Sequence, residues 1–275
     1  MTAPAPRLVA TDLDGTLLRS DHSVSERSVS ALRRAEQAGA IVVLVTGRPP
    51  RSMRPVADAV GHTGIAVCAN GAVVYDLHAD RVLETFLLDQ ATVAAVIEAV
   101  ADALPDAYFG IETTANRLVD LEWRRGRIGL SEIGSEAIKL LVRHELLGPD
   151  ELLAAARDVA GDLAEFTHSS KIGLLEISAT GVTKASTLAT VAAEHDIAAA
   201  DVVAFGDMPN DLPMLAWAGR SYAMANAHTE VLAAVRSVAP ANDDDGVAAV
   251  LEELFGVEPD SRAATTLREA ASDGG

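Results

Sequence analysis

The order of apolar runs along this chain constrains its fold more than any other feature of the sequence. Short strand-like runs at residues 8–11 and 41–45 alternate with helix-like segments at 25–38 and 51–60. Ser25 is a good N-cap for the first of these helices, and Gly39 can end it in a left-handed conformation. Alternation of this kind predicts crossover units, in which a parallel sheet carries helices on its faces.

The same alternation returns after residue 181. The helices and strands expected there lie at 184–195, 202–205, 211–218, 221–224 and 247–254. In the N-terminal region, the apolar runs 65–68 and 73–75 flank Asn70 and Gly71. This dipeptide favours a two-residue hairpin turn.

The stretch between these two regions has a different order. A helix capped by Asp89 and another opened by Pro149 are interspersed with strand candidates, which lie at 108–112, 138–142, 163–167 and 172–177. About a hundred residues of this kind can bury a core of their own. We therefore predict an α/β fold with a discontinuous core at 1–84 and 181–256, an inserted α+β domain at 85–180, and a polar C-terminal tail at 257–275.

Asp12 and Asp14 directly follow the first expected strand. Residues two apart in a strand project from the same face, so both carboxylates can leave the sheet together, and Gly15 allows a sharp turn after them. Carboxylates that close repel one another, which favours a bound metal or a shared proton. A helix-loop-helix calcium loop would need a glutamate twelve positions into the motif, where this chain has Ser23.

Three further polar clusters stand at places where strands should end or helices begin. They are Thr46-Gly47-Arg48, Lys184, and the run from Gly206 through Asp207 to Asn210 and Asp211. Each has a purely structural interpretation, as a strand-to-helix turn, a solvated lysine or a helix cap. In an open parallel sheet, however, ligands bind beyond the carboxyl ends of the strands, so these clusters are expected to converge.

The four clusters in this order resemble those of the haloacid dehalogenase-like superfamily, and most closely its Cof-type phosphatases with the large class II cap. The resemblance runs from about residue 7 to about residue 255. It implies a Rossmann-like core with a parallel sheet and identifies the inserted α+β domain as the cap. Secondary matches are Ala69-Asn70-Gly71-Ala72, Met224-Ala225-Asn226-Ala227 and the segment from Asn242 to Gly246.

By resemblance, Asp12 is the nucleophile that becomes an aspartyl phosphate, and Asp14 is the general acid and base. Thr46 and Lys184 complete the catalytic set. The resemblance also implies that Gly47, Arg48 and Asn210 contact the phosphate or substrate, and that Mg²⁺ is the cofactor. Its ligands would be the Asp12 carboxylate, the Asp14 backbone carbonyl, Asp207 and Asp211.

The implied function is a Mg²⁺-dependent phosphatase for a small phosphorylated metabolite, with sugar phosphates as the leading class. A phosphotransferase or mutase on the same core is one alternative, and a non-catalytic protein that binds phosphometabolites is another. The intact Asp12 and Asp14 argue against the second alternative, because a sensor needs neither nucleophile nor proton donor.

Composition excludes several partners. The formal net charge of −18 disfavours nucleic acid and anionic membranes. The single Cys68 lies in an apolar run and is expected to be a buried strand residue, and the scattered histidines do not support a zinc site. No apolar segment has the length of a membrane span, and the first residues lack a signal-peptide core, so we expect a cytoplasmic protein. A monomer or a homodimer is expected.

One basic segment stands out in this acidic chain. Trp123 is followed by Arg124, Arg125 and Arg127, which reach either a second anionic group of the substrate or only solvent.

Overall fold

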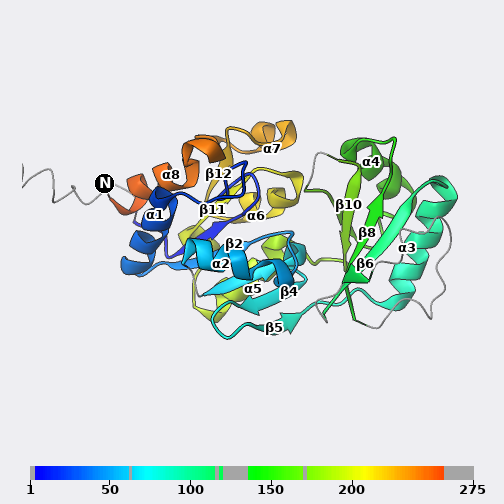
Figure 1. The fold of residues 1–275 in the computed structure, drawn as a ribbon, viewed down its shortest axis with the longest axis horizontal. Helices are drawn as coiled ribbons and strands as arrows, with labels where there is room; N and C mark the ends of the chain where they lie inside the picture. Colours follow the sequence, from blue (N-terminus) through cyan, green and yellow to red (C-terminus); the bar gives the residue numbers. More distant parts are fainter. Residues whose placement is uncertain (1–3, 62–63, 115–117, 120–135, 170–171, 257–275) are drawn as a thin grey trace, which may run out of the picture.

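The structure is a computed structural model and describes residues 4–61, 64–114, 118–119, 136–169 and 172–256. Two sheets organise it, each with its own helices (Figure 1). The larger, eight-stranded sheet has the order β13-β12-β11-β1-β2-β3-β4-β5, and the smaller, five-stranded sheet has the order β7-β6-β8-β10-β9.

The larger sheet is parallel from β13 to β3, and the hairpin strands β4 and β5 extend it in the antiparallel sense. Its central strand β1 pairs with β2 on one side and β11 on the other. Its strands are β1 (Leu8–Thr11), β2 (Ile41–Val45), β3 (Ile65–Cys68), β4 (Val73–Asp76), β5 (Arg81–Thr85), β11 (Val202–Gly206), β12 (Arg220–Met224) and β13 (Ser237–Ala239).

Helices cover both faces of this sheet because alternate strand residues point to opposite sides. Val9 and Leu44 pack with α1 (Glu26–Gln37), α2 (Arg54–Val60) and α8 (Gly246–Phe255) in one buried cluster. Leu8 and Val43 pack in the other with three helices, namely α5 (Lys184–Glu194), α6 (Leu212–Trp217) and α7 (Thr229–Ala234). Strands buried on both faces are typical of parallel sheets.

The smaller sheet is antiparallel throughout and carries two helices on one face only (Figure 1). Its opposite face turns toward the larger part of the molecule. Its elements are α3 (Gln90–Ala103), β6 (Tyr108–Thr113), β7 (Leu118–Val119), β8 (Ala137–Arg143), α4 (Pro149–Ala160), β9 (Glu165–Thr167) and β10 (Leu174–Ser178). We call residues 85–180 the cap and the remainder the core; these boundaries are our proposal.

The α/β fold with a large, mostly parallel sheet is confirmed. The expected two-residue turn at Asn70 and Gly71 is wrong in length, because Cys68 pairs with Val73 and four residues connect the strands. Tertiary contacts explain the wider loop. The Asn70 N–H donates to the carbonyl of Thr46, and the Gly71 carbonyl accepts from Thr187 Oγ1 at 2.7 Å, which draws the loop toward the strand ends.

Cys68 is a buried free cysteine, as expected, and burial raises the pKa of its thiol. Among the described residues, no helix combines the length and apolarity needed to cross a membrane. The predicted tail lies outside the described residues.

Candidate active site

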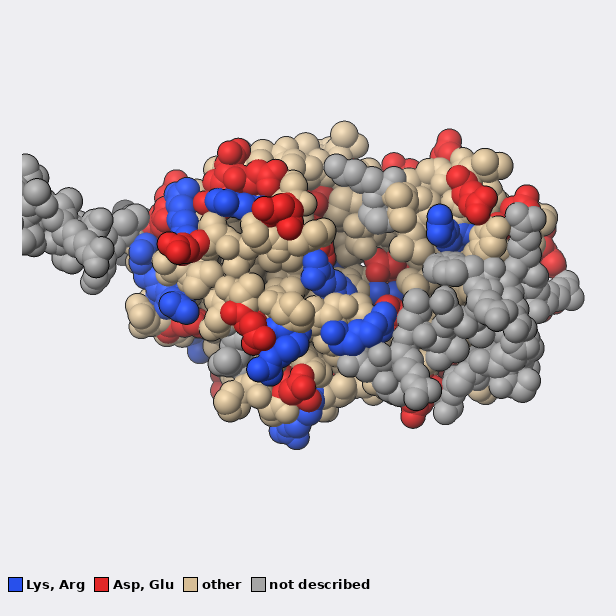
Figure 2. Space-filling model, viewed as in Figure 1, with Lys and Arg blue, Asp and Glu red and all other residues tan. Residues whose placement is uncertain are grey.

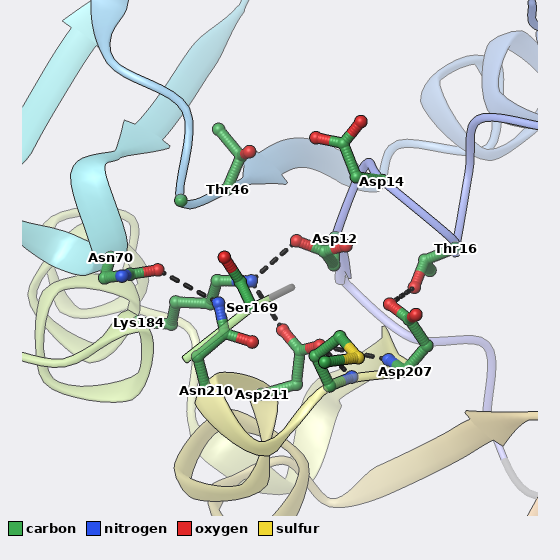
Figure 3. A network of polar contacts seen from close by, with 12 residues as sticks. Asp12, Asp14, Thr16, Thr46, Asn70, Ser169, Lys184, Asp207, Asn210 and Asp211 are labelled. Atoms are coloured by element: carbon green, nitrogen blue, oxygen red, sulfur yellow. Dashed lines mark hydrogen bonds and ion pairs between the residues drawn. The ribbon is translucent and has the colours of Figure 1, made fainter. Parts of the chain in front are cut away.

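The carboxyl ends of three neighbouring strands bring the sequence clusters together. Asp12 follows β1, and Thr46 and Asp207 follow the strands on either side of it. Lys184 is the first residue of α5 and reaches the same point, as Figure 3 shows. All four side chains are buried. The convergence expected from the sequence is therefore present in the fold.

Lys184 lies between two carboxylates. Its Nζ donates to Asp12 Oδ1 and to Asp211 Oδ1, both at 2.6 Å, and its side chain is only 1% exposed. Asp211 uses its second oxygen, Oδ2, to accept the backbone N–H groups of Asp207 and Met208 at 3.0 Å. Burial lowers the pKa of Lys184, but the two carboxylates outweigh it and raise that pKa, so the ammonium stays charged.

Three carboxylates gather around one point beside this lysine. One ligand atom each of Asp12, Asp207 and Asp211 lie within 4.8 Å of one another. Asp207 is further held by Thr16, whose hydroxyl donates to Oδ1 at 3.0 Å. Gly15 packs directly against it with φ of +82°, and a Cβ there would lie 2.3 Å from Asp207 Oδ2. Only glycine fits this turn.

The electrostatics of this cluster suit a divalent cation. Burial raises the pKa of Asp12 well above its ordinary value, and repulsion from Asp211 and Asp207 adds to it, while Lys184 opposes it. Burial and Asp211 likewise raise the pKa of Asp207 to about 7. Three buried carboxylates with a single lysine carry excess negative charge, and hard oxygen donors of this kind match Mg²⁺. The residues present therefore fit the implied metal.

Asp14 occupies a different position from the other acids. Its carboxylate lies on the Thr46 side in Figure 3 and is bound by Arg48, through Nε to Oδ2 at 2.6 Å and Nη2 to Oδ1 at 2.5 Å. Both residues line the same cavity. Arg48 thus faces the cavity, and its guanidinium is occupied by Asp14 in this state.

The remaining predicted residues lie around the strand ends. The Thr46 hydroxyl accepts the Arg48 N–H at 3.0 Å. Asn210 Nδ2 donates to Asn70 Oδ1 at 3.0 Å. Thr46, Gly47 and Asn210 also line the cavity.

Two asparagines of the secondary motifs support the loop after β1. Asn226 Nδ2 donates to the Gly15 carbonyl at 2.8 Å, and Asn242 Nδ2 donates to the Leu18 carbonyl at 2.9 Å. The two are linked to each other, because the Asn242 N–H donates to Asn226 Oδ1. These bonds fix the turn that carries Asp14.

The cavity over the site has a volume of about 260 Å³ and lies between core and cap. Its cap wall includes Glu112, Lys139, Ser169 and Glu176, none of which was predicted as a site residue. A signal for three of them was present in the sequence, since Glu112, Lys139 and Glu176 interrupt otherwise apolar strands. Blue and red atoms stand side by side where the two parts meet in Figure 2. Arg124, Arg125 and Arg127 lie outside the described residues.

Known proteins share this sequence and architecture. A model of the haloacid dehalogenase-like hydrolase family matches residues 9–122 and 124–251. The 5-amino-6-(5-phospho-D-ribitylamino)uracil phosphatase YitU of Bacillus subtilis is 27% identical over 91% of this chain and 98% of its own. The pyridoxal phosphate phosphatase YbhA of Escherichia coli is 28% identical over 88% of this chain and 96% of its own.

A solved haloacid dehalogenase-like hydrolase from B. subtilis has a TM-score of 0.73 and 25% identity, covering 90% of this chain and 99% of that one. These matches support a phosphomonoester hydrolase. Because the family model spans nearly all of the core and the cap, the chain belongs to the haloacid dehalogenase-like hydrolases, as a Cof-type member.

Proposed function

We propose that the protein is a Mg²⁺-dependent phosphatase that hydrolyses a small phosphorylated metabolite through an aspartyl phosphate on Asp12. The observation that carries this proposal is the buried arrangement of Asp12 beside Lys184, with Asp207 and Asp211 at metal-binding distance. A purely structural ion pair would need only one carboxylate beside Lys184, whereas this cluster contains three carboxylates.

In the first step an Asp12 carboxylate oxygen attacks phosphorus, and the bond from phosphorus to the leaving-group oxygen breaks. Asp14 gives its proton to that oxygen, so the product leaves as an alcohol. Before it can do so, Asp14 must leave its ion pair with Arg48 and take up a proton from solvent, to which its side chain is 42% exposed. Arg48 is then available to a phosphoryl oxygen, which fits its predicted role in substrate binding.

In the second step water attacks the phosphorus of the Asp12 phosphate. Asp14, now ionised, removes the proton from this water, and the bond between phosphorus and the Asp12 oxygen breaks. Inorganic phosphate leaves and both acids return to their starting states. One residue thus serves as acid and then as base.

Positive charge must balance the phosphoryl oxygens during both steps. Lys184 supplies one fixed charge beside the nucleophile, and the Thr46 hydroxyl and the Gly47 backbone lie at the cavity wall. Asp12, Asp207, Asp211 and the Asp14 backbone carbonyl would hold Mg²⁺, which supplies Lewis-acid stabilisation of the developing charge.

The relatives act, by their names, on a phosphorylated ribityl compound and on pyridoxal phosphate. These support a small phosphomonoester here, and a sugar phosphate or a similar compound remains the leading class. A cytoplasmic location and a monomeric or homodimeric state stay predictions.

The test is release of p-nitrophenol from p-nitrophenyl phosphate, with Mg²⁺ and with a chelator, by the native chain and by Asp12→Asn. We expect metal-dependent turnover by the native protein and a loss of about 10⁴-fold or more in the variant, which keeps the size of the side chain but lacks the nucleophile. Turnover that survives in Asp12→Asn would contradict the proposed role of this residue.

A further inference from the structure

Three charged residues of the cap sheet form a buried cluster that faces the active site. Glu112 on β6, Lys139 on β8 and Glu176 on β10 are each at most 6% exposed. Lys139 Nζ lies 2.7 Å from Glu176 Oε1 and 3.2 Å from Glu112 Oε2. We call these three residues the cap cluster.

The cap cluster belongs to the wall of the active-site cavity and not to the interior of the cap. The neighbouring strand residues Ile111, Leu140 and Leu175 pack into the apolar core beneath α3 and α4, so the alternation of the strands turns the charged residues the other way. All three cluster residues line the same cavity as Asp12 and Asp14.

Direct contacts place the cluster over the Thr46–Arg48 segment of the core. Lys139 Nζ donates to the Gly47 carbonyl at 2.7 Å, and a Cβ added to Gly47 would lie 3.3 Å from Glu176 Oε1. From the cap side, Ser169 Oγ donates to Glu176 Oε2 at 2.5 Å. The leaving group departs from phosphorus on the side away from the attacking Asp12 oxygen, and the cap forms that side of the cavity.

A cluster of this kind is costly for stability alone. Replacing a buried ion pair by apolar residues of similar volume is often neutral or stabilising, so burial of three charges in a cap wall calls for another explanation. Glu112 Oε2, although close to Lys139, has no hydrogen bond of good geometry among the described residues. Its lone pairs can accept a donor from a bound molecule.

Lys139 and Glu176 hold each other in their charged forms. Burial raises the pKa of Glu176, but Lys139 and the Ser169 hydroxyl outweigh it and lower that pKa below its ordinary value. Burial lowers the pKa of Lys139, but the neighbouring carboxylates of Glu176 and Glu112 outweigh burial, so the pKa of Lys139 is raised. Glu176 therefore presents a carboxylate acceptor to the cavity at neutral pH.

We propose that the cap cluster binds the leaving group and selects phosphate monoesters whose remaining part carries hydroxyl or N–H donors and no second anionic group. This inference rests on the phosphatase function proposed above. Carboxylates accept strong hydrogen bonds from such donors. A leaving group without them would leave the buried Glu112 Oε2 without a hydrogen bond, and an unpaired buried acceptor is the means by which a polar site rejects an apolar analogue.

A second phosphate on the substrate is disfavoured because the cations near the cavity are already paired with carboxylates. Of the described cations that line the cavity, Arg48 is paired with Asp14 and is released only to the reacting phosphoryl group, and Lys139 is bound to both glutamates. Arg51, nearby, is paired with Glu112 at 2.7 Å. A second anionic group would have to displace a carboxylate from a cation and would face the two glutamates directly.

The first test compares matched substrates with the native, Mg²⁺-loaded protein. Neutral sugar and polyol monophosphates of five and six carbons are compared with alkyl phosphates of equal chain length and with the corresponding bisphosphates. We expect kcat/KM to be at least about tenfold higher for the best polyol or sugar monophosphate than for either matched compound. Equal values, or a preference for bisphosphates or alkyl phosphates, would overturn the proposal.

The second test uses Glu176→Gln, with Glu145→Gln as the matched control, because Glu145 is an exposed cap residue away from the cavity. The ratio of kcat/KM for the best polyol phosphate to that for p-nitrophenyl phosphate should fall at least about tenfold in Glu176→Gln and stay unchanged in Glu145→Gln. A purely structural role would change both substrates alike and leave this ratio intact, which would count against the proposal.

The two proposals fail in different ways. If the native protein releases phosphate from none of these esters, p-nitrophenyl phosphate included, the phosphatase function itself is wrong. If it hydrolyses p-nitrophenyl phosphate but shows no preference among the matched esters, only the role of the cap cluster is wrong.

Discussion

Very close contacts fix the positions of single residues in the site. The clearest case is Gly15, whose backbone packs directly against the Asp207 side chain. Its φ of +82° and its contact with Asp207 leave no space for a side chain. The Asn226 amide holds its carbonyl at the same time. A turn fixed in this way positions Asp14 on one side and Asp207, a proposed metal ligand, on the other.

Gly15→Ala should therefore damage function beyond its effect on folding. The added Cβ must displace Asp207, and a shift of about 1 Å in a catalytic arrangement can cost about 10²-fold in rate. We expect a loss of that size in Mg²⁺-dependent kcat/KM. Gly181→Ala is the control, since Gly181 has a similar φ of +74° but no atom within 4 Å of its Cβ position.

Both variants should lose about 1–2 kcal/mol of unfolding free energy from the left-handed backbone, as measured by denaturant titration. Only Gly15→Ala should lose activity. Equal activity in the two variants would show that the contact with Asp207 does not matter.

Among the elements, the carboxyl ends of β1, β2 and β11 allow the position of the site to be predicted from the sequence. Asp12, Thr46 and Asp207 each follow an apolar run directly, and a parallel sheet must bring such ends to one edge. The cluster around Lys184 could therefore be anticipated without any knowledge of distances. The four-residue loop between β3 and β4 could not, because contacts of Asn70 and Gly71 with distant residues set its shape.

The cap cluster illustrates a second limit of sequence reasoning. Glu112, Lys139 and Glu176 stand on three different strands, and their meeting depends on register, such as the pairing of Glu112 with Lys139 across β6 and β8. Periodicity shows that each is a charged residue in an apolar run. It does not show which face of the sheet will be turned toward the active site.

At the scale of the whole molecule, an acidic protein must bind an anionic substrate. The net charge of −18 repels phosphate esters at long range, so attraction must come from local groups inside the cavity. Lys184 is neutralised by two carboxylates, and the excess negative charge of the acid cluster remains. A bound dication would reverse the local sign, which links metal binding to both stability and activity.

The stability of the metal-free protein and the stabilising effect of Mg²⁺ should both depend on pH. The pKa of Asp207, raised to about 7 without metal, lies above its unfolded value of 3.8, so the folded state holds more protons between these values. The metal-free protein should therefore lose stability as the pH rises from about 4 to about 7. Mg²⁺ needs the ionised carboxylates, so its stabilising effect should grow over the same interval.

We expect Mg²⁺ to raise the Tm more at about pH 8 than at about pH 5. At about a hundred times its Kd, the ion should contribute about 2.7 kcal/mol at the higher pH. Calorimetry with and without the ion measures this, and Asp207→Asn is the control in which the shift should largely disappear. An equal Tm shift at both pH values would argue against binding at these carboxylates.

Mass spectrometry can identify the residue that carries the phosphoryl group during turnover. The Mg²⁺-loaded protein is mixed with excess substrate, quenched with acid within the first turnover, digested and analysed by mass spectrometry. We expect a phosphoryl group on Asp12, in the peptide that also contains Asp14, and none in Asp12→Asn. Turnover with no phosphorylated protein, or with the group on another residue, would contradict it.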